Sequence, residues 1–176
     1  MTNETLECLE TRRSIRKYQS KQVDEEALQA ILKAGTYAPT GAGRQAPVIV
    51  VVQDQELLKK ISKMNAAVAG VPEGMDPFYG APTVAFVLAD KTAAPSWMED
   101  GALVAGNILN AAHSVGVDSC YIYRAKEVFS SDEGLAIIKE WGLDENYIGV
   151  ANCILGYRDC DYPDAAPRKD NYVIRV

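Results

Sequence analysis

The sequence is short of the side chains on which most protein-centred enzyme mechanisms depend. It contains a single histidine, His113, among 176 residues. A serine or cysteine nucleophile activated by histidine would have to use His113, which lies in a run rich in alanine and other apolar residues. A packed, hydrogen-bonded core histidine is the simpler interpretation of that setting. We therefore expect no catalytic side chain of this kind.

Paired cysteines and clustered metal ligands are also lacking. None of the four cysteines belongs to a C-x-x-C motif, and the potential metal ligands do not cluster, so we expect no metal site. Cys120 and Cys153 stand in apolar runs, which is typical of small buried hydrophobes. The first residues are acidic and polar and lack the regions of a signal peptide, so the default expectation is a cytoplasmic chain without a disulfide framework.

Long apolar runs and an excess of positive charge are missing as well. No stretch is long and apolar enough to cross a bilayer. The formal net charge of −6 argues against non-specific binding to nucleic acid or to an anionic membrane. We therefore expect neither a membrane nor a nucleic acid among the partners.

One basic segment stands out against this acidic background. Residues 11–21 contain no acid, and Arg12 and Arg16, four residues apart, are expected to share a helix face. With Arg13 and Ser14 they offer guanidinium groups and a hydroxyl that suit a terminal phosphate. The alternative is a solvated basic face that is paired with acids elsewhere.

Fingerprints for nucleotide phosphates are absent. There is no G-x-x-x-x-G-K-[ST] loop. The glycines at 41 and 43 form only a G-x-G, which precedes an apparent strand instead of joining a strand to a helix. Few catalytic side chains together with one anion site favour a protein whose cofactor carries the chemistry.

Hydrophobic periodicity predicts a single α+β domain over residues 1–176. The continuous β-branched run of residues 48–52 is typical of a strand that is buried on both faces. Other strands are expected over residues 83–88, 119–123, 147–155 and 172–176. Helices are expected after Thr2 or Asn3, over 25–35, after Asp54, over 97–115, and after Ser131 or Asp132.

Two of these elements indicate a homodimer. The helix predicted over residues 97–115 is apolar almost all round, and one small chain has little core with which to surround it. The strand predicted over residues 172–176 has no obvious partner within its own chain. We expect the helix to pack against a second copy, and the terminal strand to join the sheet edge of that copy.

Four motifs, in order along nearly the whole chain, resemble the nitroreductase family. Residues 11–18 (TRRSIRKY) resemble its opening motif, and residues 38–47 (APTGAGRQAP) resemble its P-S-x-x-N-x-Q-P-W loop. Residues 100–122 resemble its central helix and the strand that follows. Residues 154–157 (ILGY) and 167–169 (PRK) resemble its closing segment.

This resemblance implies a mixed β-sheet flanked by helices in an intertwined homodimer. It also implies FMN at the dimer interface, with NADH or NADPH as the reductant. The FMN phosphate and ribityl chain would be held by Arg12, Arg13, Ser14 and Arg16, and Arg168 and Lys169 would close over the phosphate.

The resemblance assigns a second group of residues to the flavin ring. Pro39, Thr40, Gly41 and Gln45 would line the ring, in part from the partner subunit. The backbone of residues 122–124, which includes Tyr123 and Arg124, would face its N5 and O4 edge, and Asn65 is a candidate for the polar edge.

The implied function is an FMN-dependent oxidoreductase that uses NAD(P)H to reduce an acceptor, such as a nitroaromatic or a quinone, by a ping-pong mechanism. The alternative is a flavin-binding storage or sensor protein without useful turnover, and a third possibility is an enzyme that fragments reduced flavin with oxygen. The sequence departs from the family pattern at Gly43, Arg44 and Ala46. The region between Met64 and Pro82, where many relatives have a longer helical insertion, is short.

Overall fold

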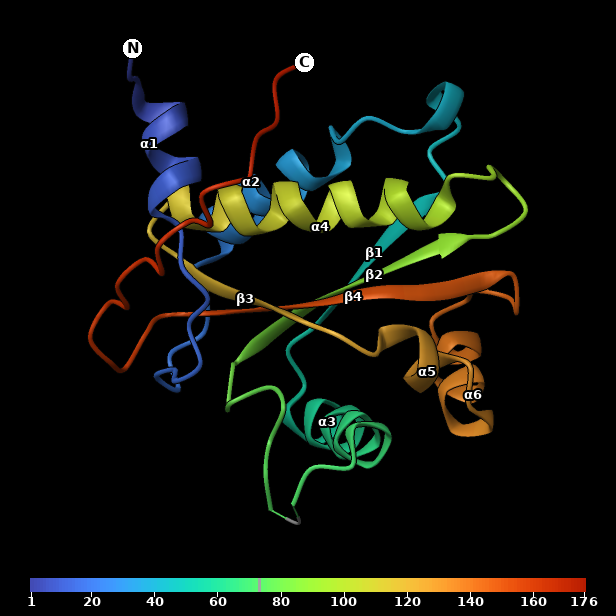
Figure 1. The fold of residues 1–176 in the computed structure, drawn as a ribbon. Coiled ribbons are helices and arrows are strands. Elements are labelled where there is room, and N and C mark those ends of the chain that lie inside the picture. Colours follow the sequence, from blue (N-terminus) through green and yellow to red (C-terminus); the bar gives the residue numbers. More distant parts are fainter. Residues whose placement is uncertain (73) are drawn as a thin grey trace.

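A four-stranded antiparallel sheet forms the centre of the molecule (Figure 1). The computed structural model describes residues 1–72 and 74–176. The strands lie in the order β1-β2-β4-β3. Their bounds are Pro47–Val52 for β1, Thr83–Asp90 for β2, Asp118–Ile122 for β3 and Tyr147–Gly156 for β4.

Helices cover both faces of this sheet (Figure 1). On one face lie α2 (Glu25–Thr36) and the long α4 (Trp97–Ser114), with α1 (Glu4–Thr11) beside the C-terminal end of α4. On the other face lie α3 (Gln55–Ala69), α5 (Ala125–Phe129) and α6 (Asp132–Glu140). A short 3₁₀ turn, Gly41–Gly43, stands in the loop before β1. No helix in the described ranges is long and apolar enough to span a bilayer.

Side-chain caps begin three of the helices. Asn3, Asp54 and Ser131 each accept a hydrogen bond from a backbone N–H in the first turn, at 2.9, 2.8 and 3.1 Å. For the helices where the sequence left two candidate caps, Thr2 or Asn3 and Ser131 or Asp132, the caps are therefore Asn3 and Ser131. Gly70 ends α3 in the left-handed conformation, with φ at 62°.

The sheet carries a separate hydrophobic core on each face. Alternate residues of β2 point to opposite faces, so Phe86 packs on the side of α5 and α6, 5.4 Å from the ring of Phe129. On the other side, Ala85 and Val87 pack against α2 and α4. These small side chains let the alanine-rich α4 lie close to the sheet.

The sheet corrects three sequence-based expectations. Residues 48–51 are only half-buried, because β1 is an edge strand and not a central one. The sheet is not mixed, since every pairing between its strands is antiparallel and the only parallel contact in the described ranges is an isolated bridge, Ser14 to Ser119. Residues 172–176 form no strand in the single chain, and their side chains are exposed.

Helix α4 is buried on the sheet side and apolar on its outer side as well. Val104, Ile108 and Ala112 are buried in the core. Met98 and Leu103 are 42% and 48% exposed. The prediction that one chain cannot cover this helix is confirmed for the single chain.

Candidate functional site

The basic segment follows α1 in an extended conformation and not as a helix. The backbone N–H of Ile15 donates to Ser119 O of β3 at 3.0 Å, and the Ile15 side chain is fully buried. The prediction that Arg12 and Arg16 share a helix face is therefore wrong, because α1 ends at Thr11 and the chain then runs beside the edge of β3.

Two arginines of this segment hold buried nitrogens without acceptors. Arg12 Nη1 and Arg13 Nε have no hydrogen-bond partner within residues 1–72 and 74–176. Arg13 Nη1 donates to Glu10 O and to Arg12 O, both at 2.8 Å. In the same ranges neither arginine forms an ion pair. A bound anion would supply the missing acceptors, since a buried donor left unpaired is costly.

A second polar group lies where β3 ends. Asn65 is fully buried on α3, and its Nδ2 donates to Tyr123 O at 2.8 Å. Asn152 of β4 donates to Ile122 O at 3.1 Å. The Oδ1 atoms of both asparagines are buried and have no partner in the described part of the chain. Sequence analysis missed Asn152, although an asparagine within an apolar strand is a recognisable signal.

The residues after β3 have an unusual backbone. Arg124 is left-handed at φ 76°, a conformation that costs free energy for a residue with a Cβ. It caps α5, and two glycines let α5 pack closely. A Cβ at Gly149 would collide with the Ala125 carbonyl, and one at Gly134 would collide with the Val128 carbonyl. These close contacts fix the place of the Tyr123–Arg124 turn.

The arginines and the turn lie along one edge of the sheet. Ser119, beside the basic segment, lies four positions along the chain from Tyr123, which directly follows β3. At 3.3 Å per residue this separation is about 13 Å. The arrangement suits an elongated ligand that has an anionic group at one end and polar atoms at the other.

The loop that contains Pro39, Thr40, Gly41 and Gln45 lies at the N-terminal end of α4, whereas the arginine segment lies near the C-terminal end of this helix. The Asp100 carboxylate, in the first turn of α4 and buried, accepts from Gly41 N at 3.0 and 3.1 Å. Gln45 N donates to Thr40 Oγ1 at 3.1 Å. Thirteen residues of helix separate Asp100 from His113, which is about 20 Å. One chain therefore does not join this loop to the arginine segment, and Asp100 was not foreseen.

The last two residues predicted for the site, Arg168 and Lys169, lie in the C-terminal tail and are exposed. Arg168 donates to Ala166 O at 2.7 Å, and Lys169 Nζ lies 5.4 Å from the centre of the Tyr172 ring. Neither forms a hydrogen bond or an ion pair with residues 12–16 in the described part of the chain. The single chain does not bring these residues into the arginine segment.

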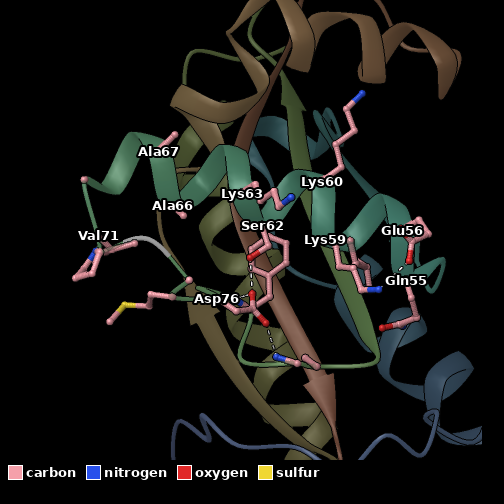
Figure 2. A pocket seen from close by; sticks show the side chains of 18 residues that line it. Gln55, Glu56, Lys59, Lys60, Ser62, Lys63, Ala66, Ala67, Val71 and Asp76 are labelled. Atoms are coloured by element: carbon pink, nitrogen blue, oxygen red, sulfur yellow. Dashed lines mark hydrogen bonds and ion pairs between the residues drawn. The ribbon is translucent and has the colours of Figure 1, made fainter.

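A hollow of about 1100 Å³ lies between α3 and the loop that follows it (Figure 2). Lys59 and Lys60 on its rim pair with Glu56 and Glu133 at 2.7 and 3.2 Å. None of the predicted site residues lines it. The loop carries no helix among its described residues, in keeping with the short region noted in the sequence.

His113 is hydrogen-bonded, as expected, but it stands at the end of α4 and not in the core. Its Nε2 lies 2.9 Å from Thr11 Oγ1. The Thr11 hydroxyl donates to Glu7 O, so Nε2 carries the proton that it donates to Thr11. Tyr162 stacks on the other side, with ring centres 6.0 Å apart.

We predict that His113 makes the FMN-free protein less stable in acid. Burial lowers the pKa of His113, Asp118 raises it, and Arg12, Arg13 and Arg158 lower it further, with a net decrease. Below about pH 6.5 the unfolded chain therefore takes up the proton first, and stability is lost as the pH falls through the folded-state pKa.

Urea titrations between about pH 7 and 5 measure this effect. The free energy of unfolding should fall less steeply with acid in His113→Gln than in the parent. Identical slopes would show that His113 does not contribute.

The antiparallel sheet and the helices on its two faces define an α+β domain, and one edge of its sheet carries two buried guanidinium nitrogens without acceptors in the described residues. The chain belongs to the nitroreductase family, whose model matches residues 9–157. The resemblance inferred from the four motifs is thereby confirmed.

Individual relatives agree over most of the chain. A protein of Archaeoglobus fulgidus, whose name includes NAD(P)H nitroreductase, is 31% identical over 88% of this chain and 85% of its own. The NADPH-flavin oxidoreductase of Vibrio harveyi is 28% identical over 98% of this chain and 72% of its own. The crystal structure of a Bacteroides fragilis nitroreductase with bound FMN is similar at a TM-score of 0.89, with 29% identity over 99% of this chain and 100% of that one.

Proposed function

We propose that this protein binds FMN at the interface of a homodimer and uses it to pass electrons from NADH or NADPH to a small-molecule acceptor. The observation that carries the proposal is the pair of buried guanidinium nitrogens, Arg12 Nη1 and Arg13 Nε, that lack acceptors in the described residues of a nitroreductase-family chain. The FMN in the similar Bacteroides fragilis structure supports the choice of ligand.

The residues present fit FMN at both ends of the proposed site. Arg12, Arg13, Ser14 and Arg16 would hold the phosphate and ribityl chain, with Arg168 and Lys169 added from the tail. At the other end, Asn65 and the backbone of Tyr123 and Arg124 would bind the polar edge of the ring. The buried Asn65 Oδ1 offers an acceptor there that is unused in the described part of the chain.

Bound FMN would supply the redox chemistry, taking a hydride from the nicotinamide and returning electrons to the acceptor in a ping-pong sequence. The protein's own groups bind and orient. Asn65 and Asn152 hold the carbonyls at the end of β3, and α5 holds the turn that begins at Tyr123. No side chain need act as a general acid or base. Nitroaromatics and quinones are the acceptors to assay first.

The dimer follows from surfaces that the single chain leaves open. The outer face of α4 exposes Met98 and Leu103. A groove of about 380 Å³, with Leu32 and Val104 among its lining residues, runs between α2 and the edge strand β1. Residues 172–176 of a second copy would add to this edge. Pro39, Thr40, Gly41 and Gln45 would then reach the flavin ring of that copy.

The visible spectrum before and after NADH or NADPH tests this function. We predict a yellow protein that releases FMN on denaturation, is bleached by NAD(P)H without oxygen, and recovers its colour when a quinone is added. FMN that NAD(P)H does not bleach would instead support the storage or sensor alternative. Failure to bind added FMN tighter than millimolar would reject the proposal.

A further inference from the structure

The phenol of Tyr162 bridges the two peptide groups on either side of Arg12. Its hydroxyl donates to Thr11 O at 2.9 Å and accepts from Arg13 N at 3.1 Å. Tyr162 belongs to the tail after β4, about 150 residues further along the chain, at separations of 151 and 149 residues from these partners. One side-chain hydroxyl thus holds both peptide groups that flank Arg12, in addition to the bonds from Arg12 N to Cys8 O and from Arg13 Nη1 to Arg12 O.

The ring of Tyr162 is held from two sides. It stacks on His113 of α4 with an interplanar angle of 14°. The guanidinium of Arg158 lies 5.0 Å from the ring centre, and Arg158 is fixed in turn by an ion pair of 3.2 Å with Asp118. Because these contacts already order the ring, little conformational entropy is lost when the hydroxyl forms its two hydrogen bonds.

We propose that Tyr162 is a positioning residue for phosphate binding, which presets Arg12 and Arg13 for the phosphate of the cofactor. The proposal rests on the function given above, in which these arginines hold the FMN phosphate. A guanidinium that is already oriented loses less conformational entropy when it binds an anion. Without the hydroxyl, the peptide before Arg12 keeps only the bond from Arg12 N to Cys8 O, and the peptide after it keeps only the bond from Arg13 Nη1 to Arg12 O. Both arginines are then held less firmly, and more of their ordering takes place during binding.

The same contact holds the start of the tail beside the arginine segment. Arg168 lies six residues beyond Tyr162, and six residues span at most about 20 Å. The proposed closure of Arg168 and Lys169 over the phosphate therefore starts from a fixed point. Tyr162 contributes to the phosphate site through Arg12, Arg13 and the tail and makes no direct contact with the ligand.

Tyr162→Phe tests the proposal, because it removes the hydroxyl and keeps the stacked ring. Tyr147→Phe is the control, since Tyr147 lies at the start of β4, outside the proposed site, and its hydroxyl forms no hydrogen bond within the described part of the chain. The FMN-free form of each protein is titrated with FMN and with riboflavin, which lacks the phosphate, and flavin fluorescence gives the Kd.

We expect Tyr162→Phe to raise the Kd for FMN about tenfold, as for the loss of about 1.4 kcal/mol of hydrogen bonding, and to change the Kd for riboflavin less than about twofold. Tyr147→Phe should leave both values unchanged. At saturating FMN, kcat with a quinone should match that of the parent.

Three results would overturn the inference. The first is an unchanged Kd for FMN in Tyr162→Phe, and the second is an equal loss for FMN and riboflavin, which would indicate general loosening. The third is full additivity of Tyr162→Phe with Arg12→Ala, because a residue that acts in part through Arg12 must lose part of its effect when Arg12 is absent. A parent that binds FMN no tighter than riboflavin would reject the proposed phosphate site itself, and this inference with it.

Discussion

Leu103→Arg should yield a monomer that does not retain FMN. The Leu103 side chain is 48% exposed on the outer face of α4, where the proposed dimer contact lies. An arginine there would bury an unpaired charge from each subunit, at a cost of several kcal/mol per ion. The dissociation constant of the dimer should rise by about a thousandfold or more.

Sedimentation at micromolar protein, together with the FMN content of the purified sample, measures this effect. Ala67→Arg is the control, because Ala67 is exposed on α3, on the opposite face of the sheet. It should leave both the dimer and the FMN content unchanged. A Leu103→Arg protein that sediments as a dimer with full FMN would contradict the proposed interface. A monomer supports the interface only if the far-UV circular dichroism of the variant matches that of the parent, which shows that the variant is folded.

Arg12→Ala should weaken FMN binding by about ten- to a hundredfold, which corresponds to a charge-assisted contact of about 1.5–3 kcal/mol. The structure directs attention to Arg12 because its Nη1 is buried without a partner in the described residues, whereas Arg16 is exposed. Arg16→Ala should therefore have the smaller effect. Riboflavin should bind equally to all three proteins, since it has no phosphate.

Equilibrium titration of the FMN-free proteins gives these affinities. Lys33→Ala, which removes an exposed charge from α2, controls for the change in net charge and should leave the Kd for FMN unchanged. Equal FMN affinity in Arg12→Ala and the parent would return the segment to the alternative of a solvated basic face.

The order of most helices and strands could be predicted because each depends on local patterns, although α5 was not foreseen and residues 172–176 form no strand in the single chain. The cap at Asp54, the left-handed glycine and the apolar spacing of α3 are all visible within about twenty residues of sequence. The burial of β1 could not be predicted in this way. A run of valines is compatible with a central or an edge strand, and only the order of strands, a tertiary property, decides between them.

The site was predictable as a set of motifs but not as a set of contacts. The arginines were found by their charge, yet their extended conformation depends on a backbone contact with Ser119, which is distant in sequence. Asp100 and Tyr162 are single polar residues in ordinary surroundings, and Asn152 is recognisable as an asparagine within an apolar strand, but its partner is not. Their partners at Gly41, at the end of β3 and beside Arg12 exist only once the chain has folded.

The glycines beneath α5 have a consequence for the inheritance of this site. A Cβ at Gly149 of β4 would collide with the Ala125 carbonyl, and a Cβ at Gly134 of α6 with the Val128 carbonyl, so an alanine would push α5 away from β4 or from α6. The displaced helix would carry with it the turn at Tyr123 and Arg124. Selection that maintains the proposed cofactor site therefore also acts on these two glycines, which have no functional group. A lineage that lost either glycine would lose the turn that is proposed to bind the ring, even if all the polar residues of the site were retained.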